Sequence, residues 1–427
     1  MESFFNVKKP DEVFSIIDGF EPVGKETVSL EDALGRVLSA DITAPEDLPA
    51  FFRSVMDGYA IMARDSFGAN ESLPAFFEVT GEVLMGEAPS VVLERGQAIN
   101  ISTGGMLPKG ADSVVMVEYC HLLDDATLEI SRAVSPLENV IQPGDDFKEG
   151  SVVFKKGHIL RPQDLGLTAG LGIPEIPVYK RPKIAIISTG DEVVPVNRRT
   201  RPGQVRDINR YTLDAFCRQA GAKPLFIGLC PDEFKPLKEM VTRALEQADM
   251  VLISGGSSVG TKDLTIKVIN ELPEFQLLVH GISISPGKPT IIGRSGKKPV
   301  IGLPGHATSA LVVAEIFLSR LIRRLSGCNY LQKRIHPLIK ARLGQNIESA
   351  GGREDYIRVR LLPKGKSIIA EPVFGKSGLI STLVEADGLV KIDMNTEGLY
   401  KDDLVEVMAF SSRYGDMYYL NEKAVQT

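Results

Sequence analysis

One stretch of the chain, residues 183–327, alternates apolar runs with amphipathic segments, and this alternation limits the possible fold more than any other feature. Strand-length runs at 183–188, 225–229, 250–253 and 275–284 alternate with helix-length segments at 208–220, 234–248 and 264–272. Two further strands are predicted within 289–303, and a last helix ends at Gly327. This pattern is typical of a parallel sheet covered by helices on both faces. The sequence therefore predicts a three-layer α/β domain.

The segments around this domain differ from it in hydrophobic periodicity and in glycine content. Two apolar stripes with helical spacing, at Val13–Ile17 and at Leu30–Leu38 behind Ser29, predict two N-terminal helices. Glycine-punctuated β-like runs predict an inserted β-rich domain, and a second β-rich region after Cys328 predicts a C-terminal β-barrel. For 427 residues we expect a multidomain α/β plus β protein. The expected domains are an elongated N-terminal or linker domain from 1–45 and 150–180, the inserted domain from 46–149, the α/β domain from 181–328 and the barrel from 329–427.

Charge and cysteine usage exclude several classes of protein. The chain carries 49 Lys and Arg against 55 Asp and Glu, a net charge of -6, which argues against a nucleic-acid binder that relies on bulk positive charge. No run approaches the roughly 20 apolar residues of a membrane span, and the N-terminus lacks an apolar signal region. The four cysteines form no C-x-x-C pair, so neither a disulfide framework nor a zinc ribbon is expected. We therefore expect a reduced, cytoplasmic protein.

The loops that follow the predicted strands are polar and rich in glycine. Ligands of open α/β sheets bind outside the carboxyl ends of the strands, so five such loops predict a site at that edge. The loops are Ser188–Glu192, Cys230–Glu233, Ser254–Gly260, Ser285–Pro289 and Gly302–His306.

Two of these loops suit a phosphate group. Ser254–Gly260 offers unhindered backbone N–H groups, and Gly302–Ser309 leads into a helix N-terminus. Thr261 separates Gly260 from Lys262, so the loop is not a P-loop, and no G-x-G-x-x-G follows a strand. ATPase and nicotinamide-binding functions are therefore not favoured.

Carboxylates recur beside these loops, at Asp191, Glu192, Asp232 and Asp263, with Asp57 and Asp145–Asp146 in the β-rich domain. Together with an anionic ligand they would need a divalent cation such as Mg²⁺ between them. The alternative is that they are helix caps and solvated turn acids, and Asp263 could be only an N-cap.

Lys288 and the arginines between 198 and 210 could contact an oxyanion or form a solvated face. The histidines show no metal-ligand spacing, and no Ser-His-Asp pattern is present.

An ordered series of motifs spans nearly the whole chain. It comprises Pro49-Ala50-Phe51, Ser54–Ala60, Ile101–Gly104, Leu107-Pro108, Gly110-Ala111-Asp112, Ser188–Glu192, Gly203–Arg210, Ser254-Gly255-Gly256 with Val259-Gly260 and Asp263, and Pro286–Pro289. In this series the chain resembles the molybdopterin molybdenumtransferases, the MoeA family, which are relatives of the gephyrin E domain. The resemblance implies an elongated homodimer of four-domain subunits, including a MogA-like molybdopterin-binding α/β domain. Its active site would lie between the β domain of one subunit and the last two domains of the other.

The resemblance also implies a reaction. Molybdate would be inserted into adenylated molybdopterin, and AMP and molybdenum cofactor would be released in a step that depends on Mg²⁺. An adenylyltransferase would supply the substrate, and neither nucleic acid nor membrane would be a partner.

Site residues follow from the matching motifs. The resemblance implies a catalytic set of Asp57, Glu192, Asp232, Asp263 and Lys288, with Mg²⁺ held by Glu192, Asp232 and Asp263. Molybdate or phosphate would contact Thr103, Lys288, Arg358 and Ser377. The full substrate-binding set is Thr103, Asp146, Ser188, Thr189, Gly190, Ser254, Gly255, Gly256, Gly260, Pro286, Gly287, Pro304, Gly305, Arg358 and Ser377. Gly58 is expected to allow a tight turn that exposes Asp57.

The chain departs from the family pattern at two places. His306-Ala307 stands where the family has Asn-Pro, and Gly281 and Ser285 stand where many members have lysine. The preference between molybdate and tungstate is therefore open. Two other functions are also open, a non-catalytic molybdopterin carrier or scaffold and the preceding adenylyl transfer.

Overall fold

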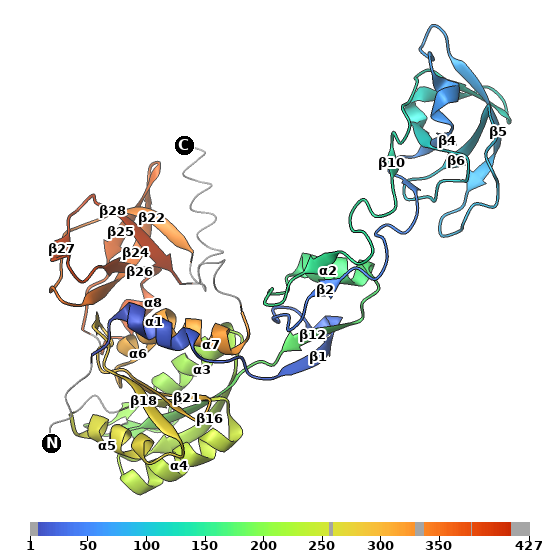
Figure 1. The fold of residues 1–427 in the computed structure, drawn as a ribbon. Coiled ribbons are helices and arrows are strands. Elements are labelled where there is room, and N and C mark those ends of the chain that lie inside the picture. The colour runs from blue at the N-terminus through green and yellow to red at the C-terminus, as the bar shows by residue number, and fades with distance from the viewer. Residues whose placement is uncertain (1–6, 256–258, 329–336, 377, 411–427) are drawn as a thin grey trace.

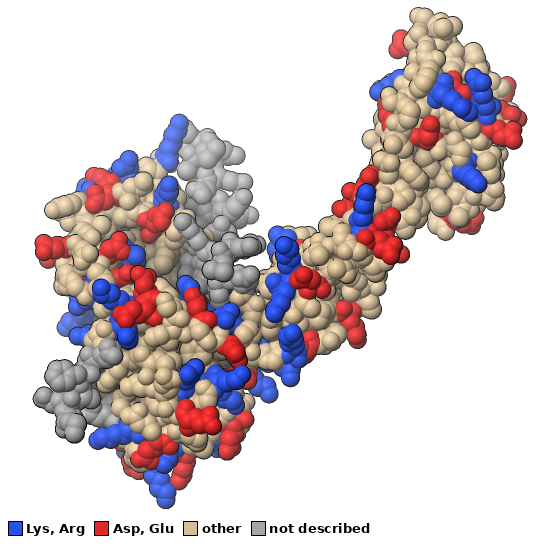
Figure 2. Space-filling view, in the orientation of Figure 1, with Lys and Arg blue, Asp and Glu red and all other residues tan. Residues whose placement is uncertain are grey.

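The computed structural model describes residues 7–255, 259–328, 337–376 and 378–410, with only the backbone described for 259–263. The molecule is elongated: an α/β domain and a small barrel lie together at one end, and an arm leads from them to a distal β-sheet (Figure 1). On the face seen in Figure 2, Lys and Arg are interspersed with Asp and Glu, as the small net charge implies. None of the described helices has both the length and the apolar character needed to cross a membrane.

The α/β domain contains a six-stranded sheet with the order β16-β13-β17-β21-β20-β18. Its strands are β13 (Lys183–Thr189), β16 (Lys223–Cys230), β17 (Met250–Ser254), β18 (Phe275–His280), β20 (Ile291–Ser295) and β21 (Lys298–Leu303). The sheet is parallel except at one strand, because β20 pairs antiparallel with both of its neighbours. A tight connection at Gly296, with φ of +56°, joins β20 to β21 and forces this direction.

Helices cover both faces of this sheet, as predicted. They are α3 (Asn209–Gln219), α4 (Phe234–Gln247), α5 (Val259–Asn270), α6 (Ala307–Val313) and α7 (Ser319–Leu325), with a π-helical segment, η4 (Ala314–Leu318), between the last two. Ile184 and Ile186 of β13 pack toward α3, α6 and α7, whereas Ala185 and Ile187 pack toward α4 and α5. Alternate residues of a strand face opposite sides, so this strand is buried on both.

Only the first of the two predicted N-terminal helices forms. Helix α1 (Pro10–Asp18) packs Val13 and Ile17 onto the α/β core. The segment Leu30–Leu38 instead contains one 3₁₀ turn, η1 (Leu30–Asp32), followed by Gly35 with φ of +70°. Leu34 is 52% exposed, and Val37 and Leu38 make β-bridges to the arm. Tertiary strand pairing therefore overrides the helical spacing of this segment.

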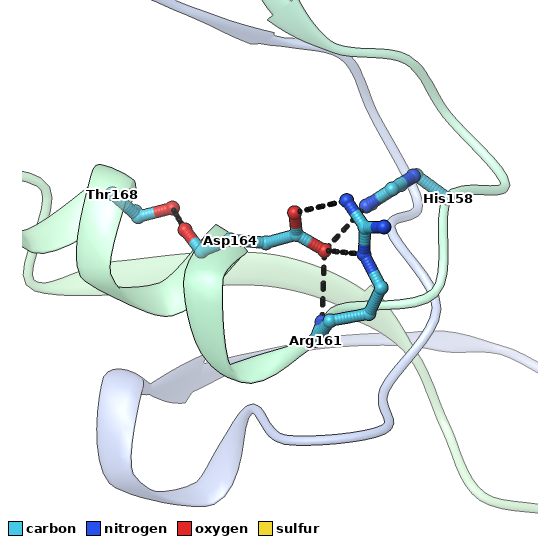
Figure 3. Close-up of polar contacts among 4 residues, drawn as sticks. All are labelled: His158, Arg161, Asp164 and Thr168. Carbon is cyan, nitrogen blue, oxygen red and sulfur yellow. Dashed lines mark hydrogen bonds and ion pairs between the residues drawn. The ribbon is translucent and has the colours of Figure 1, made fainter. Parts of the chain in front are cut away.

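The arm consists of two short antiparallel strand pairs and one helix. Strand β1 (Lys25–Ser29) pairs with β12 (Glu175–Tyr179), and β2 (Ile42–Thr43) pairs with β11 (Val152–Phe154) beside α2 (Pro162–Gly170). Asp164 of α2 is only 3% exposed and accepts hydrogen bonds from the backbone N–H and guanidinium of Arg161 and contacts His158 Nε2 at 2.7 Å (Figure 3). Burial would raise the pKa of Asp164, but these partners outweigh it and hold the pKa well below its usual range.

The distal sheet has the order β7-β4-β6-β5-β9-β8 and, as expected, is built from short strands. They are β4 (Gly58–Ile61), β5 (Ala75–Val83), β6 (Gln97–Ile101), β7 (Ser113–Met116), β8 (Cys120–Leu122) and β9 (Thr127–Ile130), with the turns η2 (Ala63–Ser66) and η3 (Val117–Tyr119). Strands β3 (Arg53–Ser54) and β10 (Val140–Ile141) pair where the chain enters and leaves this region. Separate apolar clusters form on its two sides.

The C-terminal barrel is a closed ring of five strands, which confirms the predicted architecture. The ring runs β24-β25-β22-β28-β26 and closes by pairing of β26 with β24. Its strands are β22 (Leu338–Leu343), β24 (Glu354–Lys364), β25 (Ser367–Pro372), β26 (Gly388–Ile392) and β28 (Leu404–Ala409), with the short elements β23 (Ile347–Glu348), α8 (Ser381–Val384) and β27 (Gly398–Leu399). Strand β19 (Ile284–Ser285), which follows β18, pairs with β24 and ties the barrel to the α/β domain.

Candidate active site

A cavity of about 280 Å³ opens at the carboxyl edge of the α/β sheet. Its walls come from the ends of β13, β17 and β21, from the starts of α3 and α6, and from a small flap in which β14 (Val193–Val194) pairs with β15 (Val205–Arg206). Six of the predicted site residues lie on its wall, namely Ser188, Thr189, Glu192, Ser254, Gly255 and Gly305. The prediction of a site at this edge therefore agrees with a hollow in the structure.

Gly255 allows β13 and β17 to approach each other at the cavity. A Cβ at this position would lie 2.0 Å from Oγ1 of Thr189 and 2.3 Å from its carbonyl oxygen. No side chain fits there without separating the two loops, so the glycine fixes the position of Thr189.

Gly190 provides a second close approach, with φ of +143°. A Cβ here would lie 2.8 Å from Oε2 of Glu192 and 2.7 Å from Cγ2 of Val193. The Glu192 carboxylate therefore folds back over Gly190 on the cavity wall.

Three carboxylates gather beside this loop. Burial and the charges of Asp191 and Glu192 raise the pKa of Asp232, against hydrogen bonds from the Thr189 hydroxyl and from the protein backbone. The backbone N–H of Asp232 donates to Asp191 Oδ1 at 3.1 Å. Carboxylate oxygens are the donors that Mg²⁺ prefers, and a cation here would relieve the repulsion from Asp191 and Glu192 that adds to the effect of burial on Asp232. No cluster of three metal-ligating side chains occurs among the described residues, and the Asp263 side chain lies outside them.

Asn209, the first residue of α3, is a wall residue that the site prediction missed. Its Nδ2 donates to Ser254 Oγ at 2.6 Å and to the carbonyl oxygen of Gly305 at 2.9 Å. Asn209 thus joins the loops after β17 and β21. Asn209 belongs to the motif Gly203–Arg210, so the sequence could have marked it as a site residue. Nothing in the sequence shows that its side chain points toward those loops.

The barrel contributes to the same cavity through Gly378. Thr308 Oγ1 of α6 donates to the carbonyl oxygen of Leu379 at 3.2 Å, which holds this barrel loop against the α/β domain. Arg358 supports the loop from beneath, since Nη1 donates to Thr382 Oγ1 at 2.8 Å and Nη2 to the Gly375 carbonyl at 3.0 Å. Burial lowers the pKa of Arg358. Its predicted partner in oxyanion binding, Ser377, lies outside the described residues.

The loop before β20 lies at the same sheet edge. Gly287, with φ of +118°, packs closely on α6, because a Cβ would lie 2.5 Å from Cγ2 of Val313. The Ile282 N–H donates to the carbonyl oxygen of Lys288, whose side chain is exposed. The other predicted residues here are placed as follows: Pro286 precedes Gly287, Pro304 follows β21, Gly260 lies at the start of α5, and Gly256 lies outside the described residues.

The remaining predicted residues lie in or near the distal sheet. Asp57 Oδ1 accepts hydrogen bonds from the Thr103 backbone N–H at 2.7 Å and from Thr103 Oγ1 at 3.0 Å, and these bonds lower the pKa of Asp57. Asp57 is exposed, as expected, but Gly58 itself does not form the expected turn: it begins β4, and a Cβ would lie 1.9 Å from the Val115 carbonyl oxygen. Asp146 is exposed at the connection to the arm. Within one chain the arm lies between the distal sheet and the α/β domain (Figure 1), and the α/β domain supplies most of the cavity wall.

Comparison with known proteins assigns the family. Residues 9–172 match the MoeA N-terminal region (domain I and II), residues 185–324 a probable molybdopterin binding domain, and residues 340–410 the MoeA C-terminal region (domain IV). A putative molybdopterin biosynthesis protein of Methanocaldococcus jannaschii is 36% identical over 389 residues, which are 89% of this chain and 91% of that protein. The chain belongs to the MoeA family.

Further MoeA relatives agree in sequence and in structure. The molybdopterin molybdenumtransferase of Haemophilus influenzae is 32% identical over 396 residues, 92% of this chain and 96% of that protein. The crystal structure of a molybdopterin biosynthesis MoeA protein from Pyrococcus horikoshii has a TM-score of 0.81 at 36% identity and covers 95% of this chain and all of that one. The resemblance seen in the motifs is confirmed.

Proposed function

We propose that this MoeA-family chain is a molybdopterin molybdenumtransferase, which inserts molybdate into adenylated molybdopterin and releases AMP. The observation that carries the proposal is a group of carboxylates at the carboxyl edge of the sheet: Glu192 lies on the cavity wall, and its charge and that of Asp191 act on the neighbouring Asp232. A binding module for a neutral ligand gains nothing from such a repulsive group, whereas cleavage of a phosphoanhydride with a divalent cation requires one. Relatives named molybdopterin molybdenumtransferase support the same reaction.

In this proposal Glu192, Asp232 and Asp263 hold Mg²⁺, which would neutralise charge on the phosphoanhydride oxygens when bound. The chain's own groups position the substrate. Thr189 is fixed by Gly255 and keeps Asp232 hydrogen-bonded. Lys288, on the exposed loop before β20, supplies positive charge to an oxyanion.

We further propose a homodimer of four-domain subunits, in which the distal sheet of one chain faces the cavity of the other. Asp57 is exposed, and two bonds from Thr103 fix its carboxylate. Phe51, Phe52 and Met56, which precede Asp57 in the chain, are also exposed, as is typical of an interaction surface. The arm lies between the distal sheet and the α/β domain of the same chain (Figure 1). An adenylyltransferase would provide the substrate.

The test of the reaction is AMP release from adenylated molybdopterin with Mg²⁺ and with molybdate, tungstate or neither. Release that depends on an oxyanion supports the transferase and identifies its preferred oxyanion. Tight binding without release would replace the proposal by the carrier function. Release of AMP without oxyanion and without cofactor formation would make the chain a simple hydrolase.

The test of the shared site is subunit complementation. Asp57→Ala and Glu192→Ala homodimers are each expected to lose at least 90% of turnover, because each change removes one side of both sites. Mixing the two variants under exchange conditions should restore about a quarter of wild-type turnover, since half of the dimers are mixed and each mixed dimer keeps one intact site. No recovery, although exchange is verified by differently tagged subunits, would contradict the shared site.

A further inference from the structure

Two buried polar atoms on the cavity wall have no hydrogen-bond partner within the described part of the chain. They are Ser188 Oγ, near the end of β13, and Asn209 Oδ1, at the start of α3. Their residues are 2% and 7% exposed, and both line the cavity. Buried polar groups in folded proteins are nearly always hydrogen-bonded. A ligand bound in the cavity would supply partners for these two unpaired atoms.

The neighbours of Asn209 fix the direction of its amide. Both Nδ2 hydrogens are used, one on Ser254 Oγ at 2.6 Å and one on the Gly305 carbonyl at 2.9 Å. The opposite orientation would place Oδ1 against that carbonyl oxygen, where two acceptors repel. Oδ1 is therefore the free atom, and it can only accept a hydrogen bond.

Asn209 Oδ1 can pair only with a hydrogen-bond donor. Molybdate and ionised phosphate oxygens only accept hydrogen bonds, so they would leave this atom unpaired, even though Arg206 elsewhere on the cavity wall could contact an anion. A neutral ring that carries an amino group supplies the missing donor and brings ring nitrogen or carbonyl acceptors for the Ser188 hydroxyl. Pterin and adenine both have this chemistry.

We propose that Asn209 Oδ1 accepts a hydrogen bond from the amino group of an aminopyrimidine ring, with Ser188 Oγ as its neighbour on the wall, so that this wall selects the ring rather than the phosphates of the substrate. The inference rests on the proposed function for the identity of the ligand, which contains both rings. It makes Asn209 a specificity-determining residue, in addition to its role in joining the loops at Ser254 and Gly305.

The test compares ligands that differ at the amino group. Pterin is compared with lumazine, which has a carbonyl oxygen in place of the 2-amino group, and AMP with IMP, which has one in place of the 6-amino group. Binding to the full chain is measured by fluorescence titration or calorimetry without molybdate. For the ring that occupies this wall, we expect wild type to prefer the amino compound roughly tenfold to hundredfold. In Asn209→Ala the two compounds should bind within about threefold of each other.

A purely structural role for Asn209 gives a different result. If Asn209 only joined the two loops, Asn209→Ala would weaken both compounds equally and the preference would persist. That result, or the absence of a preference in wild type for either ring pair, overturns the proposal. The pair that loses its preference identifies the ring, pterin or adenine.

Ser188→Ala keeps the test decisive if Asn209→Ala does not fold. Because Ser188 Oγ makes no hydrogen bond within the described residues, its removal should leave Tm unchanged or slightly raised, while ligand affinity falls about tenfold. Unchanged affinity in Ser188→Ala counts against the proposal. Selective binding without any transfer activity would refute the proposed function alone, whereas transfer with an intact preference in Asn209→Ala would refute this inference alone.

Discussion

Gly255→Ala should damage the proposed active site through geometry alone. The new Cβ would lie 2.0 Å from Thr189 Oγ1 and 2.3 Å from the Thr189 carbonyl, whereas real Cβ atoms essentially never approach closer than 3.0 Å. Relief of both contacts requires the β13 and β17 loops to separate by about 1 Å, and a shift of that size near reacting groups costs roughly 10²-fold in rate. Overpacking of this kind costs about 1–3 kcal/mol of stability, so the variant should still fold.

The assay is steady-state AMP release, with the melting temperature measured in parallel. Thr189→Ala should not rescue the variant, because the backbone carbonyl at 2.3 Å remains. Gly166→Ala is the matched control: a Cβ there meets nothing within 4 Å, and alanine stabilises a helix interior by about 0.5–1 kcal/mol. Turnover of Gly255→Ala within twofold of wild type would refute the claim that this contact positions Thr189.

Three further predictions concern single side chains. Asp164→Asn should destabilise the arm by about 1–3 kcal/mol, measured by hydrogen exchange of α2. Because the folded pKa of Asp164 is lowered, its stabilisation is present above about pH 4 and disappears as the pH falls through the folded pKa, so the variant should respond less to acid. Asp232→Asn should raise the melting temperature at pH 7, because the raised pKa of Asp232 means that its charge opposes folding. Turnover should fall, because the variant loses a proposed Mg²⁺ ligand. A lower melting temperature would contradict this reasoning. Gly58→Ala would place a Cβ 1.9 Å from the Val115 carbonyl oxygen and should force β4 away from β7. Turnover should fall, whereas pterin binding to the full chain, measured by titration, should not weaken.

The fold of the α/β domain could be predicted because local and tertiary signals agree there. The apolar runs at 183–188 and 250–253 are buried on both faces, and the helix stripes between them fill the two outer layers. At Leu30–Leu38 the signals disagree, because the residues with helical spacing are needed as β-bridge partners of Ile159 and Val178. Such a partner, far away in the sequence, leaves no trace in local periodicity.

The site could be predicted only as far as its loops. The carboxyl ends of parallel strands meet at one edge of a sheet, so the sequence alone could assign Ser188, Glu192 and Ser254 to that edge. The direction of the Asn209 amide depends on the Gly305 carbonyl, 96 residues away, and the sequence contains no pattern for it. The same holds for Gly58, where the close neighbour belongs to another strand of the distal sheet.

The connection to the distal sheet has a consequence for how the molecule could be rebuilt. Outgoing and returning segments are hydrogen-bonded neighbours, since the Leu48 N–H donates to the Phe147 carbonyl at 2.7 Å and the Gly150 N–H to the Ala44 carbonyl at 2.8 Å. The inserted region therefore begins and ends at one point in space, and a short turn between residues 48 and 147 could replace it. The shortened chain would keep its cavity and its arm, and the excised piece could be made separately and added back. The two halves of the proposed site could then be titrated against each other as independent molecules.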